Sequence, residues 1–479
     1  MRRLTLAPAM AAAQSTLLVL AFLLHGCTLG EVAPAWGWNT SEIAASRAWS
    51  AENETSIQRP ILLPQLLARV GNTVGSNVVA WDGRIIFTEV RLQVSDASFS
   101  DPCPVWLTCR DLDTGRLVFR RPFQPGCPDH LHKHHHLLAI GDRLFIGHSM
   151  PDAPPHEGCV GICWDIQKGE AVEESRLRRE QLPQGMVLAR TEDKEPFATD
   201  GRRLFVLDMD EHAIVLAALD VPTYQILWQQ SVATDRPESC ERYWWGIRFS
   251  ESVLLASLTL AKDAFTNDAR GGACVVAADA STGAVLWKKQ TPLFPVPRSW
   301  PETSAIAVGP SRVYLPTASD VVEAWDAHSG EKVWACRLPG KIASPISVSE
   351  GVLAVLTTDS YPSGSEKMKE FCPTLVLIDA VNGTVLRTVI SDLRLWPRDT
   401  NALAHVPGWF LLFNGGRVHG FPVDSKKQPQ KWRCWEGRAL GLIPVELPGW
   451  DYPHEQVDAT HILAWPLFGG WITLFKSSP

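Results

Sequence analysis

A short motif recurs along the chain and constrains its fold more than any other feature. An apolar segment is followed by Asp, two residues, Thr-Gly or a near equivalent, three residues and an aromatic residue. The clearest copy runs from Asp279 through Gly283 to Trp287, and a second runs from Asp326 through Gly330 to Trp334. Asp and Thr side chains bond backbone amides in tight turns, and Gly supplies the positive φ that such turns need. The motif therefore predicts the turn of a β-hairpin.

Further copies diverge more but keep the same order of residues. They comprise Asp111, Gly115 and Phe119; Asp165 and Gly169; Asp220, Thr223 and Trp228; Asp379, Gly383 and Arg387; and Asp424 with Trp432. Successive motif Asp residues lie roughly 45 to 60 positions apart, a spacing typical of repeat arrays. Upstream of each motif lies a second pair of apolar segments joined by a turn, such as residues 137–147. Two hairpins per repeat predict a four-stranded antiparallel sheet.

The repeats predict an all-β protein, a closed β-propeller whose blades are four-stranded antiparallel sheets. Residues 71–479 have room for about eight such units. Strand-like runs at 462–465 and 471–475 follow the seventh motif. An N-terminal strand that completes an eighth sheet would close the ring and leave no open edge. We favour eight blades, with seven as the alternative.

The motif resembles the pyrroloquinoline-quinone (PQQ)-like repeat, whose consensus is Ala-x-Asp-x-x-Thr-Gly-x-x-x-Trp. The resemblance covers most of the chain after its first residues. In that family the aromatic residue packs between neighbouring blades. The resemblance therefore implies docking roles for Trp228, Trp287, Trp334 and Trp432. A total of 20 Trp against 5 Tyr fits a unit that needs an indole in each copy.

Residues 1–26 are typical of an export signal. Two arginines at positions 2 and 3 precede an apolar core, Leu17 to Leu24, that is too short to remain as a membrane span. The core ends in Leu-His-Gly-Cys27, which resembles a bacterial lipobox and implies a diacylglycerol on the Cys27 thiol. An ordinary cleaved signal is the alternative. Residues 27–70 are expected to be a tether, and the protein an exported, membrane-anchored lipoprotein facing the periplasm or the cell surface.

The cysteines leave two interpretations open. Ten remain after Cys27, an even number in a compartment that permits disulfides. Cys109 and Cys163 each lie two residues before a motif Asp, at equivalent strand positions, where buried and unpaired thiols are the simpler interpretation. A local Cys103–Cys109 bridge is the other.

Long insertions are expected between the second and third strands of four blades. They would leave the propeller on one face, where long loops on a rigid scaffold commonly bind partners. Insertions tolerated on a solvated face are the alternative. The segments are Leu92–Pro104, Met150–Gly158, Lys262–Gly272 and Tyr361–Phe371.

A histidine row precedes the expected inner strand of the second blade. In an extended segment, alternate side chains project to one side, so the row would form one line at the channel mouth. Imidazoles bind Zn²⁺ or Cu²⁺, with Cys127 or Asp129 as further ligands. A polar loop of no defined role is the alternative. The row consists of His130, His132, His134 and His136.

Composition and motifs argue against several functions. The net charge of −7 and the lack of a basic stripe argue against nucleic-acid binding. The resemblance includes PQQ-dependent alcohol dehydrogenases, which use a Ca²⁺-bound quinone, a catalytic Asp and, typically, two adjacent cysteines. No two cysteines are adjacent here, and Cys-x-x-Cys-His, Gly-x-Ser-x-Gly and His-Glu-x-x-His do not occur. We assign no catalytic residue and expect no cofactor, with PQQ and calcium as the alternative.

The function predicted is that of a non-enzymatic, lipid-anchored scaffold for other envelope proteins. The chain would act as a monomer or within a hetero-complex. The proposed role is similar to that of the propeller lipoprotein of the outer-membrane β-barrel assembly machine (BamB-like). Two alternatives remain: a PQQ-dependent quinoprotein oxidoreductase, and a metal-binding or sensory propeller that uses the histidine row.

Overall fold

The fold was analysed on a computed structural model. Within the residues it describes, no helix is long and apolar enough to cross a membrane. The described residues are 62–68, 72–74, 78–91, 105–123, 135–148, 159–178, 181–182, 196–209, 213–221, 223–233, 241–262, 270–295, 306–359, 373–390, 403–414, 417–424, 427, 429–433, 454–456, 461–464 and 472–477.

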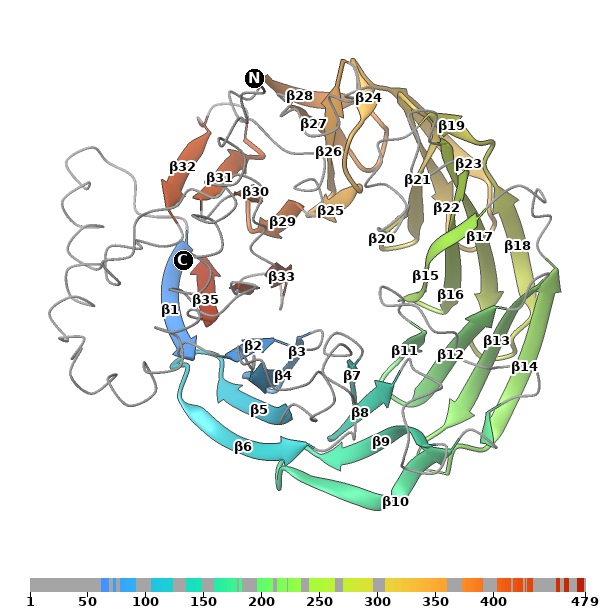
Figure 1. Ribbon diagram of the computed structural model, residues 1–479. Helices are drawn as coiled ribbons and strands as arrows, with labels where there is room; N and C mark the ends of the chain where they lie inside the picture. Colours follow the sequence, from blue (N-terminus) through green and yellow to red (C-terminus); the bar gives the residue numbers. More distant parts are fainter. Residues whose placement is uncertain are drawn as a thin grey trace, which may run out of the picture.

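The described strands form eight antiparallel sheets arranged as a ring about a central axis (Figure 1). We number the sheets first to eighth in chain order. The first four contain β2 (Asn72–Val74), β3 (Val79–Trp81), β4 (Arg84–Arg91), β5 (Val105–Asp111) and β6 (Leu117–Phe123); β7 (His135–Ile140), β8 (Arg143–His148), β9 (Cys159–Asp165) and β10 (Glu170–Arg178); β11 (Phe197–Thr199), β12 (Arg203–Met209), β13 (Ala213–Asp220) and β14 (Ile226–Ala233); and β15 (Glu241–Ser250), β16 (Val253–Lys262), β17 (Arg270–Asp279), β18 (Val285–Gln290) and β19 (Phe294–Pro295).

The other four sheets complete the ring. They contain β20 (Ala307–Gly309), β21 (Arg312–Ala318), β22 (Val321–Asp326) and β23 (Lys332–Arg337); β24 (Lys341–Ile342), β25 (Ser347–Ser349), β26 (Val352–Thr358), β27 (Thr374–Asp379) and β28 (Val385–Ile390); β29 (Leu403–Val406), β30 (Trp409–Asn414), β31 (Arg417–Pro422) and β32 (Gln430–Arg433); and β33 (His454–Gln456), β34 (His461–Ala464), β35 (Ile472–Ser477) and β1 (Leu62–Ala68). The predicted all-β propeller of antiparallel sheets is confirmed, and the eight sheets agree with the preferred blade number.

The eighth sheet joins the two ends of the described chain. Strand β1 pairs with β35 in antiparallel register, from Leu62 opposite Ser477 to Ala68 opposite Ile472. The expected boundary between tether and propeller at 70/71 is therefore wrong, because the ring already includes residue 62. Pro64 lies within β1, which is the outermost strand of its sheet. A proline is tolerated there because an edge strand has no partner on its outer side. Residues 1–61, and with them Cys27, lie outside the described residues.

The hydrophobic core lies between neighbouring sheets and is repeated around the ring. In the third sheet, β13 is buried along nearly its whole length, whereas the outermost strand, β14, is largely exposed. One core cluster joins Phe205 of β12 to Leu258 of β16, across the interface of the third and fourth sheets. A middle strand packs on both faces, which explains why these strands are continuous apolar runs in the sequence.

Each motif forms the turn between the third and fourth strands of its sheet. In the fourth sheet, the N–H of Thr282 donates to Oδ1 of Asp279 at 2.8 Å, and the N–H of Gly283 donates to the Asp279 carbonyl at 2.8 Å. Gly283 has φ of +74°. Tyr224 takes the glycine position in the third sheet with φ of +55°. Its side chain is buried, so packing offsets the left-handed conformation.

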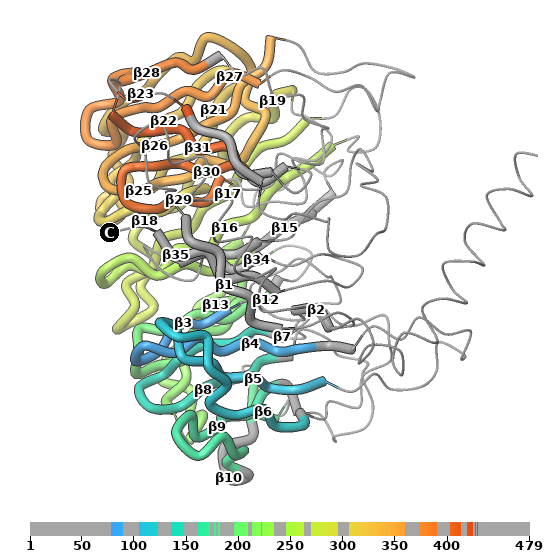
Figure 2. Tube along the Cα trace, turned by 90° about the vertical axis from the view of Figure 1, so that its left-hand side faces the viewer, coloured from blue at the N-terminus to red at the C-terminus, as the bar shows by residue number. Residues whose placement is uncertain are grey.

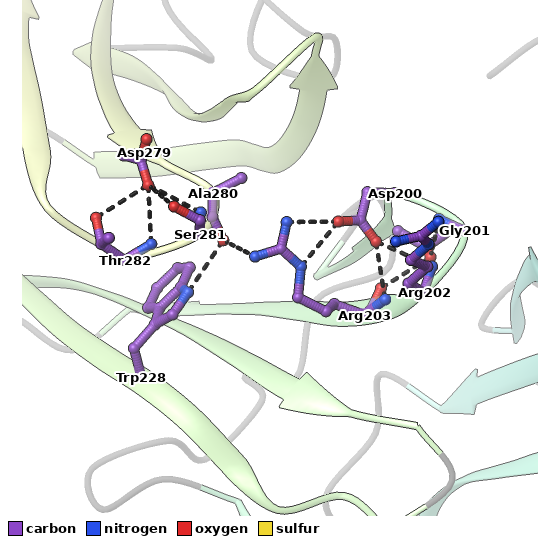
Figure 3. A network of polar contacts seen from close by, with 10 residues as sticks. Asp200, Gly201, Arg202, Arg203, Trp228, Asp279, Ala280, Ser281 and Thr282 are labelled. Atoms are coloured by element: carbon purple, nitrogen blue, oxygen red, sulfur yellow. Dashed lines mark hydrogen bonds and ion pairs between the residues drawn. The ribbon is translucent and has the colours of Figure 1, made fainter.

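An indole from each of three sheets is bonded to the motif turn of the following sheet. Nε1 of Trp228 donates to the carbonyl of Ala280 at 3.1 Å (Figure 3). Nε1 of Trp287 donates to the carbonyl of Ala327 at 2.8 Å, and Nε1 of Trp334 donates to the carbonyl of Ala380 at 3.1 Å. In each case the acceptor directly follows the motif Asp. We call this contact the indole clamp.

The motif glycine lies against the ring of the incoming indole. A Cβ on Gly383 would lie 2.7 Å from the Trp334 ring, and Gly283 and Gly330 meet Trp228 and Trp287 in the same way. The glycine is therefore required twice, for its positive φ and for the close approach of the indole.

Two seams replace the indole with another side chain. Phe119 packs on Gly169 between the first and second sheets and has no N–H to donate. Between the sixth and seventh sheets, Nη1 of Arg387 donates to the carbonyls of Pro422, Asp424 and Lys427 at 3.1–3.3 Å. The guanidinium thus keeps the function of the clamp with several bonds in place of one. Trp432 lies in β32, and its side-chain environment is outside the described residues.

Replacing Trp334 tests the indole clamp. The side chain is 9% exposed and packs beside Tyr314. We expect Trp334→Ala to lower the free energy of unfolding by about 3–5 kcal/mol, because it removes a large buried ring. Trp334→Phe keeps most of the apolar contact and loses the hydrogen bond, so about 1–2 kcal/mol is expected. Urea denaturation followed by tryptophan fluorescence measures both. Equal, small effects would show that the indole does not hold the sheets together.

Substituting two glycines that have the same φ distinguishes the cost of a strained backbone from the cost of displacing the docked indole. Gly383 and Gly351 both have φ of +77°, but a Cβ on Gly351 would meet no atom within 4 Å. We expect Gly351→Ala to cost about 1–2 kcal/mol of unfolding free energy from the left-handed backbone alone. Gly383→Ala should cost clearly more, because its methyl group displaces the Trp334 ring. Thermal unfolding by circular dichroism compares them, and identical shifts would contradict the steric role.

Candidate interaction surface

The antiparallel order gives the ring two different faces. Turns between the first and second strands, and the motif turns, lie on one face, which we call the turn face. The connections between second and third strands, and those between successive sheets, begin and end on the opposite face, the loop face. Figure 2 shows the short turns gathered along one side of the ring. Strand polarity alone therefore brings every long connection to one face.

The four expected insertions join strand ends on the loop face, and three of them lie wholly outside the described residues. The expected insertion Lys262–Gly272 is too long. Lys262 ends β16 and pairs with Arg270 at the start of β17, so only residues 263–269 are left between them. Gly271 and Gly272 belong to β17, and β19 pairs with the strand there, with Phe294 opposite Gly271. The close approach leaves no room for a side chain, because a Cβ on Gly272 would lie 3.0 Å from the Thr291 hydroxyl.

The motif carboxylates are occupied by the turns in which they lie. Oδ1 of Asp279 accepts from the amides of Ser281 and Thr282 at 2.9 and 2.8 Å (Figure 3). The hydroxyls of the same two residues also donate to it, and together they hold the pKa of Asp279 below its ordinary value. The Thr114 hydroxyl and amide do the same for Asp111.

Other copies repeat this arrangement with different donors. The backbone amide of Lys168 holds the pKa of Asp165 low, and the amide and hydroxyl of Ser329 do so for Asp326. These aspartates are thus ionised turn formers. A carboxylate held in this state is a poor general base, because the bonded donors stabilise its charge.

Four cysteines of the described strands are buried and form no disulfide: Cys109, Cys163, Cys274 and Cys336. The Cys103–Cys109 bridge considered from the sequence is therefore wrong. Burial raises the pKa of Cys109 to about 11, so its thiol stays protonated and unreactive at neutral pH. Sγ of Cys163 lies 3.2 Å from the Tyr224 hydroxyl. These thiols fill the core.

The histidine row is only partly within the described residues. His130, His132 and His134 lie outside them. His136 is in β7, the strand of the second sheet nearest the axis (Figure 1), and its ring meets Phe197 edge-on with 6.2 Å between centroids. The described part of the chain contains no cluster of three or more His, Cys, Asp or Glu side chains that could hold a metal. The metal site stays a prediction.

A buried ion pair lies on the first sheet, on the face opposite the one that packs against the second sheet. Glu89 is 1% exposed, and its Oε2 lies 3.1 Å from Nη2 of Arg120. The Arg120 guanidinium stacks over the Trp106 ring, with Cζ 4.0 Å from the ring centroid. Burial lowers the pKa of Arg110 on the same face. Both ionic partners belong to one sheet, which indicates a structural pair.

Exposed apolar residues recur where the outermost strands begin, a feature that sequence reasoning missed. They lie two or three positions after the motif glycine, or after Tyr224, and are 39–51% exposed. Their signal in the sequence is one or two apolar residues directly before the docking residue, which is aromatic in every copy of this set except that of Arg387. Repeated exposed apolar groups are candidate contact points for a partner. We call the set the apolar rim: Leu117, Val118, Ile226, Leu227, Val285, Val333, Val385 and Leu386.

Comparison with known proteins places the repeats and the fold. Residues 271–386 match a family model described as outer membrane protein assembly factor BamB. Quinohemoprotein alcohol dehydrogenase from Comamonas testosteroni has a similar structure, with a TM-score of 0.50 and 11% identity over 87% of this chain and 76% of that one. BamB from Moraxella catarrhalis is 12% identical over 86% and 100% of the two chains, with a TM-score of 0.48. No curated protein sequence matches the chain significantly. At 11% identity the likeness to the dehydrogenase shows the fold alone.

The motif aspartates make a contribution to stability that depends on pH. The pKa values of Asp111, Asp165, Asp279 and Asp326 are lowered in the folded state. Their contribution is therefore present above the unfolded value, about 4, and is lost as the pH falls through the lower folded value. Asp279→Asn keeps an acceptor in the turn but does not titrate. We expect the melting temperature of the wild type to fall more steeply than that of Asp279→Asn between pH 5 and about pH 2. Parallel curves would contradict the ionised turn.

Proposed function

We propose that this β-propeller of PQQ-like repeats is a non-enzymatic scaffold that binds other proteins of the cell envelope. The observation that carries the proposal is the division between its two faces. On the turn face, the motif carboxylates accept hydrogen bonds from backbone amides of their own turns. On the loop face, every long connection begins and ends. A rigid ring that presents variable loops on one side is suited to partner binding.

The specific form of this proposal is a role in the assembly of outer-membrane proteins. It is supported by the match of residues 271–386 to the family model described as outer membrane protein assembly factor BamB. An export signal and a lipid on Cys27 would keep the propeller at the membrane surface, where such partners are found. We expect Cys27→Ser to move the protein from the membrane fraction to the soluble envelope fraction.

Site-specific photocrosslinking from the two faces tests the scaffold. A photoreactive amino acid would replace Arg270, which is exposed at the loop-face end of β17. The matched control would replace Thr114, exposed in a motif turn on the turn face. In the native host we expect crosslinks to envelope proteins from position 270 and few or none from position 114. Identification by mass spectrometry then tests the assembly role. Equal labelling from both faces, or none from position 270, would contradict the proposal.

An activity assay tests the opposing view. Purified protein would be incubated with PQQ and Ca²⁺, and reduction of a redox dye followed after addition of an alcohol or a sugar. We expect no turnover, because carboxylates such as those of Asp279 and Asp111 are held as ionised turn formers. Stoichiometric binding of the quinone together with dye reduction would overturn the scaffold in favour of an oxidoreductase.

A further inference from the structure

We propose that the outer edge of the third sheet is a docking site for an extended segment of a partner protein, which adds to strand β14 as a fifth, antiparallel strand. Within the described part of the chain, β14 pairs with β13 on one side only. The inference rests on the proposed scaffold function only in that the partner is a protein. It concerns the circumference of the ring and not the loop face.

The hydrogen bonds of the motif turn show which groups of β14 face inwards. The N–H of Asp220 donates to the carbonyl of Gln225 at 2.9 Å, and the backbone N–H of Tyr224 donates to the carbonyl of Asp220 at 2.7 Å. The backbone groups of Asp220 thus face β14. Alternate residues of an antiparallel strand face the same neighbour, so Leu216 also faces β14, and its partner Gln230 faces back.

The residues on either side of Gln230 therefore point their backbone groups outwards. Ser231 and, two residues on, Ala233 present both N–H and C=O to the free edge. Two side-chain contacts agree with this direction. Nε2 of Gln230 donates to the Ser231 carbonyl at 3.0 Å, and Nζ of Lys288 donates to the Ala233 carbonyl at 2.7 Å. Gln230 and Lys288 are themselves half-buried, but both hydrogen bonds are exposed to solvent, so an incoming strand can compete for these carbonyls.

The composition of β14 sets it apart from the other outermost strands. Edge strands are normally protected against pairing by charged residues or proline. Strand β14 has neither over its eight residues, Ile226–Ala233, and it alternates between exposed and half-buried positions. Every other outermost strand has at least one: Pro64 in β1, Arg120, Arg121 and Pro122 in β6, Glu170, Glu173, Glu174, Arg176 and Arg178 in β10, Lys288 and Lys289 in β18, Lys332 and Arg337 in β23, Arg387 in β28, and Lys431 and Arg433 in β32.

The two ends of β14 indicate what kind of segment would fit. At its start, Ile226 and Leu227 are 47% and 51% exposed and offer apolar contact. At its end, the Lys288 ammonium lies against Ala233. In antiparallel pairing, the N-terminal end of the partner lies opposite Ala233. The segment therefore has a carboxylate at its N-terminal end to meet Lys288, and the rest of it is uncharged and rich in β-forming residues.

A peptide titration tests this site directly. The probe is an acetylated peptide, Glu-Thr-Val-Thr-Val-Thr-Val-Thr, with a fluorophore at its C-terminus, titrated with the purified full chain and followed by anisotropy. Ser231→Lys places a charge on the free edge and is expected to weaken binding by about fivefold or more. Ser231→Thr is the matched control and should change it by no more than about twofold. Neither change removes a bond between β13 and β14.

Two further measurements locate the peptide. Hydrogen–deuterium exchange should show new protection of the fragment that contains Ser231 and Ala233, and little change in the other outermost strands. Lys288→Glu should weaken binding of the peptide that begins with Glu and strengthen binding of the same peptide when it begins with Lys. A peptide with two valines replaced by proline should not bind, because it cannot extend the sheet.

Several outcomes would overturn the inference. They are no binding of the probe, equal binding to Ser231→Lys and Ser231→Thr, or protection outside β14. Sedimentation that shows a dimer of the free chain, lost in Ser231→Lys, would replace the partner segment by a second copy and so overturn it as well. Loop-face crosslinking from position 270 is independent of Ser231, so failure of this site leaves the scaffold proposal standing, and the reverse holds too.

Discussion

The contact between an indole and the turn of the next sheet is the interaction on which the ring depends. A four-stranded sheet cannot bury both of its faces alone, so each blade is stable only against its neighbours. Trp228, Trp287 and Trp334 direct that packing, because each indole has one carbonyl to reach and one glycine to cover. The clamp joins the third sheet to the fourth, the fourth to the fifth and the fifth to the sixth, and the pairing of β1 with β35 closes the ring.

This use of the motif also limits what the motif can do chemically. Its Asp shapes the turn, its Gly accommodates the indole, and the carbonyl between them accepts the indole N–H. These motif groups serve the fold itself, and we therefore place the proposed binding functions in the connections and in the strand edges. The loop face and the free edge of β14 are such places, and they lie on different parts of the ring.

Much of the fold could be predicted from the sequence, because turns and strand periodicity depend on neighbouring residues. The motif turns at Asp111, Asp279 and Asp326 lie where the pattern predicted them. The errors arose where distant segments meet. Residues 62–68 carry no local signal for their partner strand, β35. Gly271–Gly272 have the composition of a loop, and only the pairing of β17 with β19 accounts for their place in a strand. The motif placed Arg387 at the position of the aromatic residue but gave no sign of its contacts, because its acceptors lie in the next sheet.

The sequence by itself determined that the chain is a repeated hairpin unit with an aromatic residue at a constant distance from each turn. That information is local, because backbone conformation at Asp-x-x-Thr-Gly depends on residues within a few positions. Only the tertiary structure decided how the ring closes through β1 and β35, which backbone groups of β14 are exposed, and that Cys109 is free. Those properties depend on which strands become neighbours, and long-range pairing leaves no short-range pattern in the chain.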